Sequence, residues 1–296
     1  VERYSNLSRR ICKERPDPLV ALEWMKETDR SRVFYTKIAL MVGNFLGAAG
    51  FAILFGGTMW DSIFSGICGI VVGIVSMLRD KVKANQFFRI ILASFIMSVL
   101  AYASAATGII GNADIVIIGA LMLLVPGLLF TNAMRDIING DTNSGMNRII
   151  QVFLIAIAIA LGTGAAWSVV AQLWQPPVSV PGLTHGIPME LLASLLGCVG
   201  FSILFNIHGP GGLLCSLGGV LTWLVYALVL EFGGSDLMGY FWGALFASGY
   251  AEVMARVRKY PAISYLVVSI FPLIPGAGVY YTMTLAVNGQ TDAFLQ

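Results

Sequence analysis

Two Pro-Gly pairs interrupt apolar stretches of this chain, Pro126–Gly127 near the middle and Pro275–Gly276 near the end. Proline has no N–H group and its ring clashes with the carbonyl group four residues earlier, so an α-helix breaks or kinks there. The break frees carbonyl groups at the end of one half-helix and N–H groups at the start of the next. Such groups can hold the ammonium and carboxylate groups of a small solute. The two pairs therefore predict a binding site, not a covalent reaction.

Polar side chains follow each Pro-Gly pair at helical spacing. Thr131 and Arg135 come at successive steps of four residues after Gly127, and Asn132 lies on the adjacent row. Polar groups inside apolar runs are costly unless they are paired or hydrated. Hydrogen bonding between helices is the alternative role for Thr131 and Asn132. The predicted substrate-binding residues are Pro126, Gly127, Thr131, Asn132, Arg135, Pro275, Gly276, Tyr280, Tyr281 and Thr284.

Two acidic residues, Asp136 and Glu252, are the candidates for carrying a coupling proton. For Arg135 and Asp136 the alternative is a structural ion pair at the membrane edge. For Glu252 it is an ion pair with Arg256, which follows four residues later.

Three other polar residues have structural interpretations. We expect Asn44 to hydrogen-bond to a neighbouring helix, Asn206 to terminate a helix, and His185 to lie solvated in a proline-rich outer loop.

The composition is typical of a membrane protein, with 57% hydrophobic and 11% charged residues and a mean hydropathy of +0.80. A helix needs about 20 apolar residues to cross a bilayer. We predict an all-α polytopic membrane protein of about nine spans. The first Pro-Gly pair lies at membrane depth, because residues 113–125 reach only about 20 Å at the α-helical rise. The expected spans are 33–56, 62–79, 87–107, 113–138, 144–173, 188–206, 211–231, 236–255 and 262–287.

All 18 lysines and arginines fall on one side of this arrangement. They lie in residues 3–37, in the loop after the second span, around the junction of the fourth and fifth spans, and after the eighth span. Lysine and arginine collect in cytoplasmic loops, so we predict a cytoplasmic N-terminus.

An internal repeat relates the two halves. Gly47–Phe55 reappears as Gly197–Phe205, 150 residues later, and the Pro-Gly pairs are 149 residues apart. Five spans separate the two copies, so the second enters the membrane from the opposite side, as in many secondary transporters. We expect the helix that would close the second half to lie outside this sequence.

Four segments follow from this repeat. They are a basic cytosolic segment at 1–32, a first membrane repeat at 33–175, an external proline-rich linker at 176–187 and a second membrane repeat at 188–296. Within the first of these, residues 19–25 form a short amphipathic helix.

Glycines four residues apart favour close packing of helices, either inside one subunit or between subunits of a homo-oligomer. The pairs are Gly43 and Gly47, Gly69 and Gly73, and Gly239 and Gly243.

The chain has no H-E-x-x-H, G-x-S-x-G or P-loop motif, and its two histidines and four cysteines lack metal-ligand spacing. We therefore expect no enzyme activity, no cofactor, no metal and no nucleic-acid partner. The expected partners are a small-molecule substrate and the lipid bilayer.

Several motifs resemble those of the threonine/serine exporter family. They are residues 124–127, 131–136 and 139–141 in the first half and residues 200–206 and 271–276 in the second. The resemblance covers residues 33–296. It implies a bacterial inner-membrane exporter built from two related five-helix halves, with serine and threonine efflux driven by the proton gradient. The family's cytosolic N-terminal domain is expected to lie mostly outside this sequence.

The residues and the resemblance together predict a secondary active exporter of small hydroxy amino acids. One alternative is an exporter of a small dicarboxylate such as succinate, to which some two-subunit relatives are linked. The other is a passive channel, or a membrane subunit that acts only with a partner.

Overall fold

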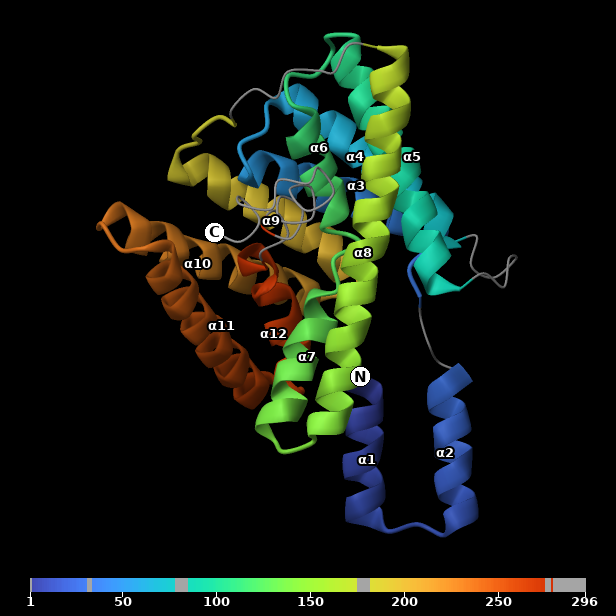
Figure 1. Ribbon diagram of the computed structural model, residues 1–296. Helices are drawn as coiled ribbons and strands as arrows, with labels where there is room; N and C mark the ends of the chain where they lie inside the picture. The colour runs from blue at the N-terminus through green and yellow to red at the C-terminus, as the bar shows by residue number, and fades with distance from the viewer. Residues whose placement is uncertain (1, 31–33, 78–84, 175–181, 275–277, 279–296) are drawn as a thin grey trace.

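A computed structural model of the chain describes residues 2–30, 34–77, 85–174, 182–274 and 278 (Figure 1). Within these ranges the chain is helical and contains no strand. A short 3₁₀ helix, η2, follows the last α-helix at Phe271–Leu273. The α-helices are α1 (Glu2–Glu14), α2 (Pro18–Arg30), α3 (Lys37–Leu54), α4 (Met59–Met77), α5 (Gln86–Ala106), α6 (Ala113–Leu121), α7 (Gly127–Ile138), α8 (Thr142–Leu173), α9 (Ile187–Leu204), α10 (Pro210–Glu231), α11 (Asp236–Arg258) and α12 (Ala262–Ser269).

Six of these helices, α3, α4, α5, α8, α9 and α10, are long and apolar enough to cross a membrane. On α8, Phe153, Ile157 and Leu161 are exposed at steps of four residues, so they form an apolar stripe suited to lipid. The chain is therefore an all-α, multi-pass membrane protein. The total of nine spans stays a prediction, because α6, α7 and α12 are individually short and α11 is less apolar.

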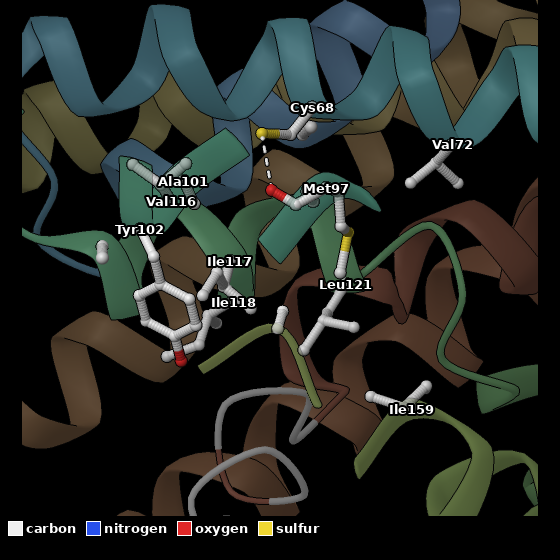
Figure 2. Close-up of a cluster of buried hydrophobic side chains, with 14 of the residues drawn as sticks. Cys68, Val72, Met97, Ala101, Tyr102, Val116, Ile117, Ile118, Leu121 and Ile159 are labelled. Carbon is white, nitrogen blue, oxygen red and sulfur yellow. Dashed lines mark hydrogen bonds between the residues drawn. The ribbon is translucent and has the colours of Figure 1, made fainter. Parts of the chain in front are cut away.

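The first half of the chain encloses an apolar core between α4, α5, α6 and α8 (Figure 2). Val116, Ile117 and Ile118 of α6 are almost completely buried, and after Asp114 in its first turn the helix carries only apolar residues. The thiol of Cys68 on α4 donates a hydrogen bond to the carbonyl oxygen of Met97 on α5, with a sulfur–oxygen distance of 3.5 Å. A helix whose faces are all apolar is stable inside a bundle, and α6 occupies such an interior position.

The two halves meet where α3 crosses α9, through pairs of glycines. A Cβ atom added to Gly50 would stand 2.4 Å from the nitrogen of Gly197. A Cβ atom added to Gly200 would stand 2.4 Å from the nitrogen of Gly47. Only glycine permits this backbone contact, and the prediction that Gly43 and Gly47 pack inside one subunit is confirmed.

The other two glycine pairs also pack within the chain. Gly69 of α4 lies against the Asn44 carbonyl of α3, and Gly239 of α11 lies against the Tyr226 ring of α10. The amide of Asn44 donates to the Leu40 carbonyl of its own helix at 2.7 Å, so the predicted bond to a neighbouring helix is wrong. Its side chain instead packs on Gly73, where an added Cβ atom would come within 2.7 Å of the Asn44 amide nitrogen.

The segments before α3 and α9 each reach the end of the other helix. The hydroxyl of Tyr35 donates to the Ile207 carbonyl at 3.1 Å. Nε2 of His185 lies 3.0 Å from the Gly57 carbonyl oxygen, so the expectation that His185 is merely solvated is wrong. Asn206 ends α9 with a φ of 58°, which confirms its predicted role at a helix end.

The basic N-terminal segment forms a hairpin of α1 and α2 that projects from one end of the bundle (Figure 1). The predicted amphipathic helix is confirmed within α2, which has no buried residue, whereas α1 was not predicted. Nη1 of Arg9 donates to the Lys259 carbonyl at 2.8 Å, and Arg10 lies over the Trp24 ring at 3.9 Å. The first contact holds the hairpin to the turn after α11, and the second joins α1 to α2.

Candidate functional site

The predicted interruption in the first half is confirmed, because α6 ends at Leu121 and α7 begins at Gly127. Pro126 is the N-cap of α7, with φ −83° and ψ 52°, and supplies no side-chain cap. Among the described residues, the carbonyl oxygens of Met122, Leu123 and Leu124 accept no backbone hydrogen bond. The break therefore offers hydrogen-bond acceptors in the interior of the bundle.

The break in the first half contacts Ile274 of the second half. A Cβ atom added to Gly127 would stand 2.4 Å from Cδ1 of Ile274, the residue that precedes Pro275. The predicted site residues of the second half lie outside the described residues. These are Pro275, Gly276, Tyr280, Tyr281 and Thr284.

Aromatic side chains of both halves lie next to this contact. The rings of Phe201 on α9 and Phe271 on η2 are stacked with centroids 4.0 Å apart, and Phe51 of α3 meets Phe201 edge-on at 5.6 Å. A Cβ atom on Gly47 would stand 3.1 Å from Cδ2 of Leu123, so the α3–α9 crossing supports the break directly. The break is thus positioned by the interface between the halves.

The predicted polar row on α7 divides into residues that face inward and one that does not. The hydroxyl of Thr131 donates to the Gly127 carbonyl at 3.0 Å, one turn earlier, so it points toward the break. Asn132 is half-buried, whereas Arg135 is exposed. The structure therefore keeps Thr131 with Gly127 and places the Arg135 side chain on the surface.

Both candidate coupling acids form ion pairs. Oδ2 of Asp136 lies 3.0 Å from Nε of Arg148 on α8, so its partner is Arg148 and the expected pairing with Arg135 is wrong. Nε of Arg256 donates to Oε1 of Glu252 at 2.9 Å, and both side chains are exposed, which confirms the structural alternative for Glu252.

Asp141 shapes the turn between α7 and α8. Its carboxylate is the N-cap of α8 and accepts a hydrogen bond from the Ser144 N–H at 3.2 Å. Hydrogen bonding to Ser144 is the main reason that the pKa of the Asp141 carboxyl lies below its usual value. The turn fixes the start of α8, and with it the position of Arg148.

One feature of the site was missed from the sequence, a cavity of about 150 Å³ next to the break. Arg89 was assigned only to a cytoplasmic loop, although it lies one turn inside α5. An arginine within an apolar run was the available signal. The cavity is lined by Val75, Ser76, Gln86, Arg89, Ile90, Ala93, Leu123 and Leu124.

These observations define a multi-pass membrane protein with an interrupted helix at the interface of its two halves. A family model described as "Putative threonine/serine exporter" matches residues 1–170, and another described as "Threonine/Serine exporter, ThrE" matches residues 190–296. The chain belongs to the threonine/serine exporter family of membrane transporters, and the resemblance noted in the motifs is confirmed. No curated protein and no solved structure matches the chain.

Proposed function

We propose that this protein is a secondary active transporter that exports threonine and serine, with the substrate held at the interrupted helices. The observation that carries the proposal is the contact of Gly127 with Ile274, which brings the first interruption beside the residue before Pro275. A hydroxy amino acid has an ammonium group for the carbonyl oxygens of residues 122–124, which accept no backbone hydrogen bond within the described ranges, and a carboxylate for N–H groups at the start of α7.

The two halves form an inverted repeat in this proposal. Two sets of contacts across the interface support it, because each has a counterpart 150 residues away. Gly50 lies on Gly197 as Gly200 lies on Gly47. Tyr35 approaches the carbonyl of Ile207 as His185 approaches that of Gly57. Such reciprocal contacts are expected when two copies of one fold pack about a pseudo-two-fold axis.

Proton coupling is part of the proposal, and Asp136 is the stronger of the two candidate acids. Asp136 is half-buried beside Arg148 at the end of α7, the helix that begins at the break. Glu252 lies on the exposed surface of α11 with Arg256. A proton on Asp136 would weaken its attraction to Arg148 and could release the end of α7.

The proposed location is the bacterial cytoplasmic membrane, with the N-terminus in the cytoplasm. The clustering of all lysines and arginines in alternate loops supports this orientation. A homo-oligomer is a further proposal, for which the glycine pairs give no support, because they pack within one chain.

The experiment that tests this function is export from proteoliposomes that contain the purified chain. We expect saturable counterflow of labelled L-threonine that L-serine inhibits and that a pH gradient accelerates. Saturable succinate flux without threonine flux would favour the dicarboxylate alternative. Flux that rises without saturation would favour a channel, and absence of flux would contradict the proposal.

A further inference from the structure

Arg89 is a partly buried cationic side chain that the proposed function does not use. It lies one turn inside α5, and its Nε atom is buried without a hydrogen-bond acceptor among the described residues. A buried donor that has lost water and gained no acceptor is unfavourable, more so when it is charged. The position therefore suits a ligand that supplies the missing acceptor.

The cavity beside Arg89 has the size and the lining for a small carboxylate. Its volume is about 150 Å³, and a cavity of that size accommodates a molecule as large as benzene. Gln86 and Ser76 contribute polar groups to the wall, and no acidic residue is among the described lining residues. A guanidinium group binds a carboxylate through two parallel hydrogen bonds, which gives both strength and orientation.

The same cavity reaches the helix break. Leu123 and Leu124 line it, and their carbonyl oxygens accept no backbone hydrogen bond among the described residues. A guanidinium group and free carbonyl groups in adjoining positions are complementary to a zwitterion. A molecule that enters the cavity thus meets a partner for each of its charges.

We propose that Arg89 binds the carboxylate of the exported molecule in this cavity, before the molecule passes to the interrupted helices. The inference rests on the proposed function for the identity of the ligand. Arg89 lies in the loop-proximal turn of α5, on the side of the chain where the lysines and arginines collect. The cavity is then the entry site on the cytoplasmic side, and the carbonyl oxygens of Leu123 and Leu124 favour an amino acid over a dicarboxylate there.

The test compares Arg89→Gln, Arg89→Lys and the control Arg258→Gln in proteoliposomes of the full chain. Arg258 lies over the Tyr260 ring and is not among the described residues that line the cavity. We expect Arg89→Gln to raise the KM for L-threonine about tenfold or more, since a hydrogen bond to a charged group is lost. Arg89→Lys should raise the KM less, because lysine keeps the positive charge but lacks the two parallel N–H donors of the guanidinium group. Arg258→Gln should leave KM unchanged.

A second readout separates carboxylate recognition from a structural role. L-Threoninamide has no carboxylate, so it should compete poorly with L-threonine in the wild type. In Arg89→Gln the amide and the acid should compete equally. If the ratio of competition by L-threoninamide to competition by L-threonine stays at its wild-type value in Arg89→Gln, the inference is overturned. An unchanged KM would also overturn it. Should Arg89→Gln not fold, Arg89→Lys decides through the same two measurements.

Two further measurements identify the class of ligand and distinguish a failure of this inference from a failure of the proposed function. The KM effect should be the same in phosphatidylcholine vesicles and in vesicles that also contain phosphatidylglycerol. An effect confined to the anionic vesicles would assign Arg89 to a lipid headgroup and overturn the inference. If the wild type transports neither cargo, the proposed function fails. Thermal stabilisation by L-threonine or succinate that Arg89→Gln abolishes would still support the carboxylate site, and equal stabilisation would refute it.

Discussion

Gly50 of α3 lies directly on the backbone of Gly197 of α9, and an added Cβ atom would stand 2.4 Å from the Gly197 nitrogen. Backbone atoms cannot yield as a flexible side chain can, so Gly50→Ala must push the two helices apart. We expect this variant to lower the thermal unfolding temperature in detergent by several degrees, because overpacking costs about 1–3 kcal/mol. Differential scanning fluorimetry with a tryptophan signal measures the change.

The matched control is Gly249→Ala on α11, where no heavy atom lies within 4 Å of an added Cβ. Both positions are helical, so both substitutions gain the helix propensity of alanine, about 0.5–1 kcal/mol. Gly249→Ala should therefore leave the unfolding temperature unchanged or raise it. Equal temperatures for the two variants would contradict the close α3–α9 contact.

The second prediction concerns the contact between Gly127 and Ile274. A Cβ atom on Gly127 would stand 2.4 Å from Cδ1 of Ile274, which is the flexible end of a side chain. Gly127→Ala should therefore fold but move Ile274 away from the break, and we expect a several-fold loss of threonine export. Adding Ile274→Ala should restore most of the loss, because it removes the clashing atoms.

The double-mutant cycle for this pair uses export rates and unfolding temperatures of the four proteins. We expect the double variant to differ from the sum of the two single variants, both in export rate and in unfolding temperature. Losses that simply add would show that the two residues act independently. In that case the first interruption would not be positioned by the second half.

The third prediction concerns Asp61, a buried carboxylate near the start of α4. Its Oδ2 accepts hydrogen bonds from the N–H and the hydroxyl of Thr58, and its Oδ1 accepts from the N–H groups of Gly111 and Asn112. The side chain thus ties the α5–α6 loop to α4. In Asp61→Asn the amide NH₂ group would face N–H or O–H donors where a carboxylate oxygen had accepted their hydrogen bonds. We therefore expect a loss of about 2–3 kcal/mol of stability.

Thermal unfolding in detergent checks this prediction, with Glu231→Gln as the control. Glu231 is exposed at the end of α10, so its substitution should have no measurable effect. A small effect of Asp61→Asn, comparable to that of the control, would argue against the four-bond arrangement.

The helix break and the glycine contacts could be predicted from the sequence because each depends on local chemistry. Proline at position 126 removes a backbone donor whatever surrounds it. The small residues at 43 and 47 mark the face of α3 on which another helix can pack closely. The repeat at 150 residues also indicated that α3 and α9 are equivalent helices, although it could not show that they touch.

The remaining features depend on how distant segments meet. Asp61 lies in the first turn of α4, yet its carboxylate also accepts hydrogen bonds from Gly111 and Asn112, in a loop 50 residues away. The partner of Asp136 is set by where α8 begins, so the adjacent Arg135 was a misleading choice. The cavity at Arg89 exists only because α5 packs beside the unwound residues Leu123 and Leu124. None of these contacts has a local pattern.

The last prediction separates the structural role of the Asp136–Arg148 pair from its proposed role in coupling. The two side chains have relative exposures of 19% and 40%, so water screens the pair and each charge removal should cost about 1 kcal/mol. Asp136→Asn and Arg148→Gln should each lower the unfolding temperature slightly. The exchanged pair Asp136→Arg with Arg148→Asp should recover stability, because opposite charges again face each other.

The coupling role requires a group on α7 that can bind and release a proton. Asparagine cannot do so, and Asp136→Asn should therefore keep threonine counterflow but lose its acceleration by a pH gradient. If Asp136→Asn instead transports with the full response to pH, the pair is only structural, and Glu252→Gln, measured in the same vesicles, becomes the test of the other candidate acid.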